Sequence, residues 1–132
     1  MVRALPAVAA LCALALSACG ESDEKKVDQT VRDFVTATNA RDANKFCDHL
    51  ASQQFLEQST GATGGKARDA CHQQMKSLKS FKLTLKKISS TKVAGDNARV
   101  RTVLLVQGQT QDQLFRLKKQ GGDWKLAGGA GG

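Results

Sequence analysis

The spacing of apolar residues changes once along this chain, and that change restricts the fold more than any other feature. From Asp23 to Ala40 the apolar side chains recur with the period of a helix, on a face made by Val27, Val31, Phe34, Val35 and Thr38. After Ser80 they alternate with polar residues, as in a strand, at Phe81, Leu83 and Leu85. We therefore expect helices first and an antiparallel sheet second, which is the α+β class.

Turn-forming residues divide the first half into three predicted helices, of which Asp23–Ala40 is the longest. Asp42 is a good N-cap for a second, shorter helix, and that helix turns inward Phe46, Cys47 and Leu50. One further turn is expected around Phe55-Leu56, followed by a loop over residues 59–65. The third helix covers residues 66–79 and presents a stripe of Ala67, Cys71, Met75 and Leu78.

The second half is expected to form about four strands. Ile88 and Val93 break the alternation that precedes them, which predicts a bulge or bend near Lys87 in a long first strand. Turns are predicted at residues 95–97, 108–111 and 121–123, and the later strands at residues 98–107, 114–119 and 124–127. Three helices should thus pack on one face of a curved antiparallel sheet. The side chains expected to be mostly buried are Val31, Phe34, Val35, Leu83, Leu85, Val100, Leu104, Val106, Phe115, Leu117 and Trp124.

The first eighteen residues have the layout of a secretory signal, with Arg3 before an apolar stretch and small residues at its end. The run Leu16-Ser17-Ala18-Cys19 resembles the lipobox of bacterial lipoproteins. This resemblance implies cleavage before Cys19, a diacylglyceryl thioether on its sulfur, and anchoring to the extracytoplasmic face of the cell membrane. The alternative is an ordinary signal cut after Ala18. The predicted organisation is a signal over residues 1–18, the lipidated cysteine and tether over 19–26, one domain over 27–127 and a flexible glycine-rich tail over 128–132.

Cys47 and Cys71 are the only other cysteines that follow the predicted signal. In an exported protein such a pair usually forms a disulfide. The alternative is a metal site, because His49 and His72 lie close to the two cysteines in the sequence. His49 is two residues from Cys47, about 200° around a helix, so the two side chains would not converge on one ion. The disulfide is the favoured interpretation, and no metal is expected.

Positive charge is concentrated in the second half of the chain. The formal net charge is +8, and residues 61–132 alone carry +10 because they hold fourteen basic and four acidic side chains. Strand alternation places one set of basic residues away from the helices, around a small apolar centre at Val103, Leu105 and Leu114. The set is Lys82, Lys86, Arg99, Arg101, Arg116, Lys118 and Lys125. This pattern suits an anionic lipid or wall polymer; the alternatives are a solvated face or a homodimer interface. Nucleic acid is a poor partner for an exported chain with so few aromatic residues.

Catalytic signals are few. His49 or His72 could form a general acid–base pair with Asp48 or Asp69, but solvated side chains on amphipathic helices are the simpler interpretation. The chain lacks the usual nucleophile, zinc, calcium and dinucleotide motifs, so no cofactor is expected.

The element order, together with the run Val31–Ala37, the segment Phe46–Leu50 and the ending Asp123-Trp124-Lys125-Leu126, is similar to the nuclear-transport-factor-2-like (cystatin-like) superfamily. The resemblance implies a curved sheet around the first helix, enclosing a cone-shaped cavity. Members include isomerases, dehydratases and ligand-binding or accessory domains; the enzymes use a carboxylate or histidine base with Tyr or Asp donors. This chain has no Tyr. We therefore expect a non-enzymatic, membrane-anchored binding or accessory domain for a small ligand or an anionic envelope component. The alternative is a small cavity enzyme, of the isomerase or hydrolase type, with a His–carboxylate pair.

Overall fold

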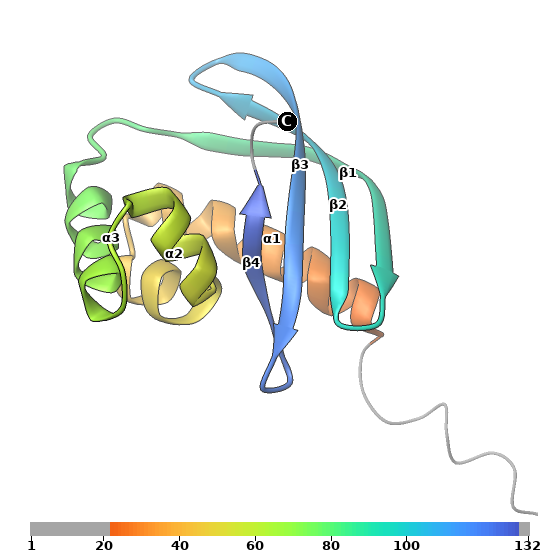
Figure 1. The fold of residues 1–132 in the computed structure, drawn as a ribbon. Coiled ribbons are helices and arrows are strands. Elements are labelled where there is room, and N and C mark those ends of the chain that lie inside the picture. Colours follow the sequence, from red (N-terminus) through yellow and green to blue (C-terminus); the bar gives the residue numbers. More distant parts are fainter. Residues whose placement is uncertain (1–21, 130–132) are drawn as a thin grey trace, which may run out of the picture.

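The computed structural model describes residues 22–129 (Figure 1). The predicted signal segment, the lipidation site at Cys19 and the last three residues of the predicted tail lie outside this range. None of the helices within it is long and apolar enough to cross a membrane.

Helix α1 (Asp23–Ala40) has the bounds that the apolar period predicts. The Ser22 hydroxyl accepts a hydrogen bond from the Lys25 N–H at 3.3 Å, which caps the first turn. The helix ends at Ala40, and the next residue, Arg41, is left-handed with a φ of 53°. The Asp42 N–H thereby bonds back to the Ala37 carbonyl at 2.9 Å, and the Arg41 N–H bonds to the Thr38 carbonyl at 3.2 Å. The helix therefore includes residues 23–26, the last part of the segment predicted to be a tether.

Three helical elements follow α1, so the described chain has four helices where three were predicted. They are η1 (Asn44–Leu50), which is π-helical, α2 (Gln53–Thr60) and α3 (Gly65–Ser77). The carboxylate of Asp42, the predicted cap, accepts from the Lys45 N–H at 3.0 Å. The expected single turn around Phe55-Leu56 is the eight-residue helix α2. Its length follows from a cap that the sequence analysis missed, because the Ser52 hydroxyl accepts from the Phe55 N–H at 3.1 Å.

Four antiparallel strands form one sheet in the order of the sequence. They are β1 (Leu83–Ala94), β2 (Asn97–Val106), β3 (Gln109–Gln120) and β4 (Asp123–Gly129). The bulge predicted near Lys87 is present between Leu85 and Lys87, and a second one lies between Ile88 and Ser90. Each bulge shifts the alternation by one residue, which keeps Ile88 and Val93 on the side of the helix.

The predicted turn at residues 108–111 was too long. Val106 pairs directly with Gln109, so the turn contains only Gln107 and Gly108, both with positive φ (53° and 85°). A two-residue turn of this kind matches the twist of the flanking strands. Strand β3 consequently begins at Gln109 rather than Leu114. The longer β2–β3 hairpin curls over at its turn end (Figure 1).

The core lies between α1 and the inner face of the sheet, which bends around this helix (Figure 1). Eight of the predicted core residues are buried: Val31, Val35, Leu83, Val100, Leu104, Phe115, Leu117 and Trp124. Phe34, Leu85 and Val106 are only partly buried. Leu85 adjoins the first bulge, and Phe34 and Val106 line a cavity, so each of the three lacks neighbours on one side.

Candidate functional site

A cavity of about 400 Å³ lies between the helices and the curled end of the sheet. Its wall is formed by the second half of α1, by η1, α2 and α3, and by the ends of β1, β2 and β3 that lie nearest to them. The apolar lining includes five phenylalanines and one methionine, namely Phe34, Phe46, Phe55, Met75, Phe81 and Phe115. None of the side chains that line the cavity is ionisable, because the one cysteine among them, Cys71, is in a disulfide.

Aromatic contacts hold the shape of this wall. The Phe34 ring lies 5.5 Å from that of Phe46 and 5.4 Å from that of Phe115, measured between ring centroids. Phe46 also contacts Phe55, at 6.2 Å. These tilted and edge-on arrangements are the favourable ones for aromatic pairs, so one continuous cluster joins α1, η1, α2 and β3.

The cavity also has a few polar lining groups, among them Thr38 from α1 and Gln111 and Gln113 from β3. Thr38 is on the predicted apolar face of its helix, whereas the two glutamines lie outside every strand predicted from the sequence. Both glutamines face inward because they alternate along β3 with the same spacing as the buried residues Phe115 and Leu117. A predicted strand that began at Gln109 would have placed them on the inner face.

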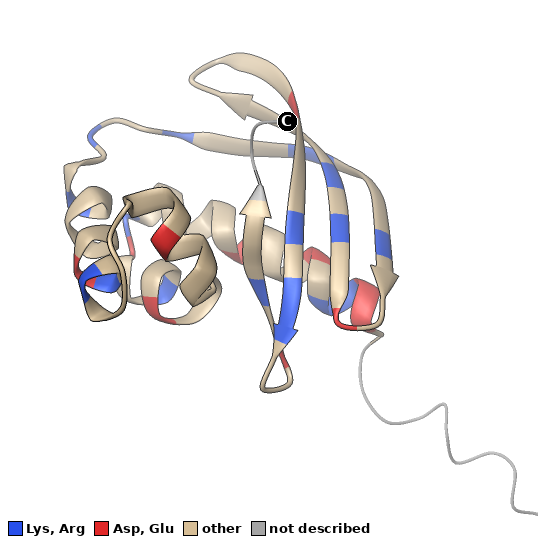
Figure 2. Ribbon diagram, viewed as in Figure 1, with Lys and Arg blue, Asp and Glu red and all other residues tan. Residues whose placement is uncertain are grey.

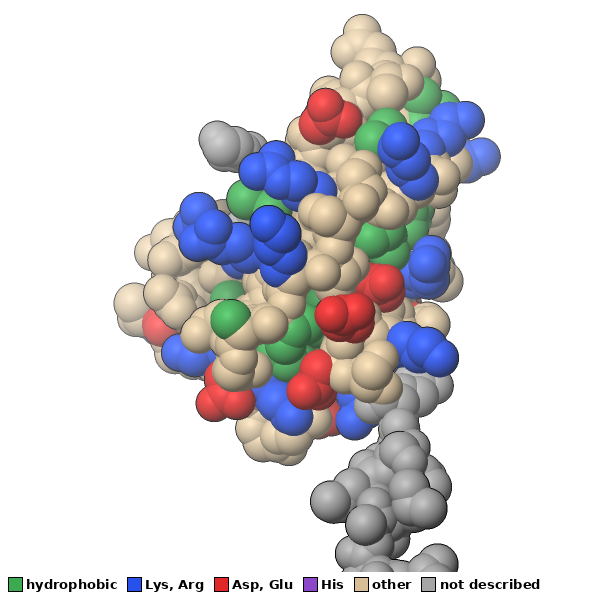
Figure 3. Space-filling view, turned by 90° about the vertical axis from the view of Figure 1, so that its right-hand side faces the viewer, with side chains coloured by type: hydrophobic (Ala, Val, Ile, Leu, Met, Phe, Trp, Pro, Cys, Tyr) green, Lys and Arg blue, Asp and Glu red, His purple; other side chains and the backbone are tan. Residues whose placement is uncertain are grey.

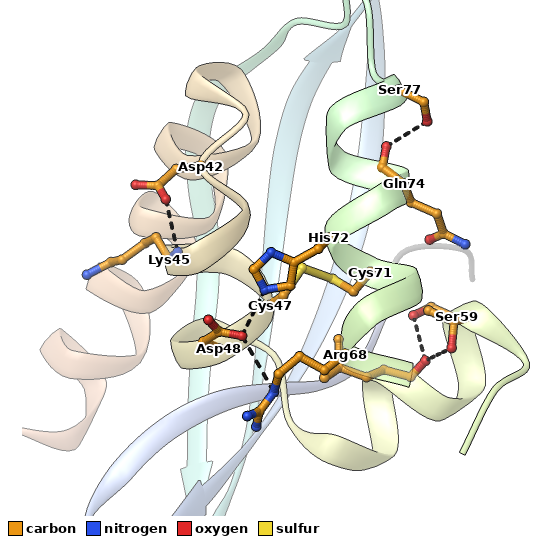
Figure 4. Close-up of a disulfide and its surroundings, with 12 residues drawn as sticks. Asp42, Lys45, Cys47, Asp48, Ser59, Arg68, Cys71, His72, Gln74 and Ser77 are labelled. Carbon is orange, nitrogen blue, oxygen red and sulfur yellow. Dashed lines mark hydrogen bonds and ion pairs between the residues drawn. A yellow bond between two sulfur atoms is a disulfide. The ribbon is translucent and has the colours of Figure 1, made fainter. Parts of the chain in front are cut away.

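The predicted disulfide between Cys47 and Cys71 is formed, with the two Cα atoms 6.0 Å apart. It connects η1 to α3, and the figure shows a polar cluster beside it (Figure 4). Asp48 Oδ1 lies 3.0 Å from His72 Nε2 and 3.5 Å from Arg68 Nε. Within the described residues we find no group of side chains that could hold a metal ion.

The His–carboxylate pair considered from the sequence therefore exists as His72 with Asp48, but it lies outside the cavity. The two side chains are 26% and 30% exposed, and neither is among the lining residues. His49 and Asp69 are exposed. His49 borders a different, polar hollow, together with Lys26, Lys45 and Trp124.

The basic residues singled out from the sequence lie mainly on the outer side of the sheet. Arg99 pairs with Arg116 across β2 and β3, and Lys118 pairs with Lys125 across β3 and β4. All of the set are exposed except Lys125, which is half-buried. Half-exposed apolar side chains occupy the centre of this outer face, at Val103, Leu105 and Leu114.

Two further lysines belong to the outer face, Lys87 opposite Val103 and Lys92 opposite Arg99. Simple alternation does not identify these two lysines, because two bulges shift the register of β1. Figure 2 shows Lys and Arg recurring along all four strands. The view turned by 90° (Figure 3) shows Lys and Arg side chains in separate groups, with polar and acidic residues between them.

Comparison with known proteins gives no match to a family model and none to a curated protein sequence. Solved structures do match. A cystatin-like protein of unknown function from Nostoc punctiforme has 19% identity and a TM-score of 0.56, and the match covers 81% of this chain and 74% of that one. The fold is cystatin-like.

Two other solved structures have a similar fold. A protein from Shewanella frigidimarina, provisionally described as a ketosteroid isomerase, has 19% identity and a TM-score of 0.55, covering 79% of this chain and 92% of that one. A nuclear-transport-factor-2-like protein of unknown function from Shewanella oneidensis has 16% identity and a TM-score of 0.51, covering 80% and 94%. The predicted α+β class and the cystatin-like, nuclear-transport-factor-2-like arrangement are confirmed at the level of the fold. At these identities, function does not follow from the likeness.

Proposed function

We propose that this protein is an exported lipoprotein whose domain binds a small, mainly apolar molecule in its cavity without transforming it. The observation that carries the binding proposal is a cavity of about 400 Å³ with no ionisable side chain in its lining. Its volume is within the range of ligand sites, which are generally apolar with a few placed polar groups. Burying an ion there would be costly because no opposite charge is available to pair with it.

The absence of a titratable side chain from the lining also supports binding rather than catalysis. General acid–base catalysis needs a group within hydrogen-bond reach of the proton that it transfers. His72 and Asp48 are such a pair, yet they lie on the outer side of the disulfide, away from the cavity lining. Their contacts, which connect η1 to α3, are those of a structural cluster (Figure 4).

Anchoring is supported by sequence and by the position of α1. Cys19, the predicted lipidation site, comes three residues before Ser22, the cap of α1. Three residues span at most about 11 Å when fully extended. A lipid on Cys19 would therefore hold the start of α1 next to the membrane. The cavity is lined by Phe34 and Thr38, in the second half of the helix, about 16–22 Å further along its axis.

The basic outer face supports a second contact, with an anionic lipid or wall polymer. A tethered domain stays near its membrane, so weak attraction acts at high effective concentration. Each Lys or Arg near an anionic surface contributes up to about 1 kcal/mol, within roughly a Debye length.

Filling the cavity tests the binding proposal. Val106 lines the cavity, whereas its neighbour Leu105 is on the outer face of β2. We expect Val106→Trp to weaken binding of the neutral apolar dye N-phenyl-naphthylamine at least about tenfold, roughly 1.4 kcal/mol. Leu105→Trp adds the same ring on the other face and should leave dye binding unchanged. Equal dye binding by both variants and the parent chain would show that the cavity is not the binding site.

A further inference from the structure

Two polar atoms of the cavity wall are buried without a hydrogen-bond partner, and they belong to Thr38 and Gln113. The atoms are Thr38 Oγ1, on α1, and Gln113 Oε1, on β3. Thr38 is only 5% exposed. Buried polar groups are nearly always paired, and each exception in a native protein needs an explanation.

Thr38 differs from the other buried threonines. Thr30, on the same helix, donates its hydroxyl to the Lys26 carbonyl at 3.0 Å, and Thr102, on β2, donates to the Gln113 carbonyl at 3.1 Å. Both follow the usual pattern, in which a buried hydroxyl bonds to the backbone. The Thr38 hydroxyl has no such contact, although Thr38 is one of the residues that line the cavity.

Gln113 presents an acceptor. Its side-chain NH₂ donates to Gln111 Oε1 at 3.1 Å, which leaves Gln113 Oε1 as the free end of the amide. A carbonyl oxygen has lone pairs but no proton, so only a donor such as O–H or N–H can satisfy it. Thr38 can either donate or accept.

The two groups flank the same aromatic contact. Thr38 is one helical turn after Phe34, and Gln113 is two residues before Phe115, on the same side of β3. The Phe34 and Phe115 rings meet at 5.4 Å. Thr38 and Gln113 are therefore the polar lining residues that adjoin this aromatic contact, one on α1 and one on β3.

We propose that the cavity selects an uncharged apolar molecule that carries a hydroxyl group, such as a long-chain, terpenoid or phenolic alcohol. Both oxygens are closed to water in the ligand-free chain, so binding turns the two side chains toward the cavity. The ligand hydroxyl then donates to Gln113 Oε1 and exchanges a hydrogen bond with Thr38. A carboxylate is disfavoured because no cationic side chain lines the cavity. About 400 Å³ holds roughly thirteen water-sized groups, at about 30 Å³ each. This inference rests on the proposed binding function and specifies its ligand.

The experiment measures displacement of the neutral dye from the chain that begins at residue 20, after the predicted lipidation site, by decanol, undecane and decanoate. These probes have similar length but end in a hydroxyl, a methyl or a carboxylate. Thr38→Val keeps the shape of the side chain and removes its hydroxyl. We expect it to weaken decanol binding about tenfold and to leave the affinity for undecane unchanged. Decanoate should bind the parent chain more weakly than decanol.

Thr36→Val is the matched control, since Thr36 is an exposed threonine on the same helix. It should leave the affinities for decanol and undecane unchanged. Thr38→Val should also raise the Tm of the ligand-free chain, because it removes a buried hydroxyl that has no partner. If Thr38→Val weakens decanol no more than undecane, or if the parent chain prefers decanoate to decanol, the inference is overturned while apolar binding remains intact. If the dye itself does not bind, the proposed function fails.

Discussion

Asp23 links the start of α1 to β3 and to the edge strand β4. Its Oδ1 accepts from the Trp124 indole N–H at 3.2 Å and from the Lys119 ammonium at 3.4 Å. The Lys119 ammonium in turn lies 5.9 Å from the centre of the Trp124 ring. The indole N–H, followed by Lys119, holds the pKa of the Asp23 carboxyl below its ordinary value of 3.8. One residue of the first helical turn thus connects α1 to β3 and β4.

This lowered pKa predicts a loss of stability in acid. The Asp23 carboxylate stabilises the folded state above pH 3.8, and its contribution disappears as the pH falls through the lower folded-state pKa. Asp23→Asn should therefore lower the Tm at pH 7 and reduce the further fall in Tm between about pH 5 and pH 2. Glu24→Gln, which removes an exposed acid from the same turn, is the control. Parallel Tm–pH curves for the parent chain and Asp23→Asn would contradict this role.

The disulfide is expected to affect both stability and binding, because Cys71 bonds to Cys47 and also lines the cavity. The bond closes a loop with a sequence separation of 24. Replacing both cysteines by Ala should lower the free energy of unfolding by about 3 kcal/mol. It should also weaken dye binding, since η1 and α3 would no longer be held together. Urea unfolding of the oxidised, reduced and Ala-substituted chains measures the first effect. Coincident midpoints would show that the bond contributes little.

At the scale of the elements, periodicity in the sequence predicted the bounds of α1 and the first bulge of β1 because both depend on local patterns. It did not predict the length of α2, since Ser52 was not recognised as a cap, or the second bulge near Ser90. Each bulge changes which side chains face outward, so Lys87 and Lys92 were missed on the outer face. The pattern within β1 indicates that its alternation is interrupted, but the number and positions of the bulges depend on how β1 pairs with β2.

We predict that the outer face of the sheet binds anionic membranes through its basic side chains. Replacing Arg99, Arg101 and Arg116 by Glu should abolish binding of the mature chain to vesicles that contain anionic phospholipid. Binding by the parent chain should fall steeply as salt rises from about 0.05 to 0.5 M, because the Debye length shortens. Thermal stability should change little, since all three side chains are exposed.

The matched control reverses the same amount of charge on α3 and just after it, at Lys66, Lys76 and Lys79, which are also exposed. This variant should still bind well if the sheet face makes the contact. A similar loss in both variants would mean that only the net charge matters, and equal binding to neutral vesicles would exclude an electrostatic contact.

At the scale of the whole molecule, the sequence was sufficient for the α+β class, and the family resemblance implied a cavity, but neither predicted the residues that line it. The cavity depends on how far α3 stands from the curled end of the sheet, and that distance is set by contacts between distant segments. The Asn39 side chain, for example, bonds to both the N–H and the carbonyl of Leu83, at 2.8 and 2.7 Å, and ties the end of α1 to the start of β1. The unpaired atoms of Thr38 and Gln113 likewise become visible only when α1 and β3 are placed together.

The last prediction concerns anchoring of the whole protein. Acyl chains contribute about 0.8 kcal/mol per buried CH₂, so two chains hold a small domain in high salt, where charge attraction is screened. The parent protein should therefore stay with membranes after a salt wash, and mass spectrometry should find acyl groups on an amino-terminal Cys19. Cys19→Ser should lose the acylation and the cleavage before residue 19. Cys12→Ser, within the predicted signal, should change neither. A Cys19→Ser protein that is still processed at that bond, and still sediments with salt-washed membranes, would show that the lipid anchor is not what holds the domain.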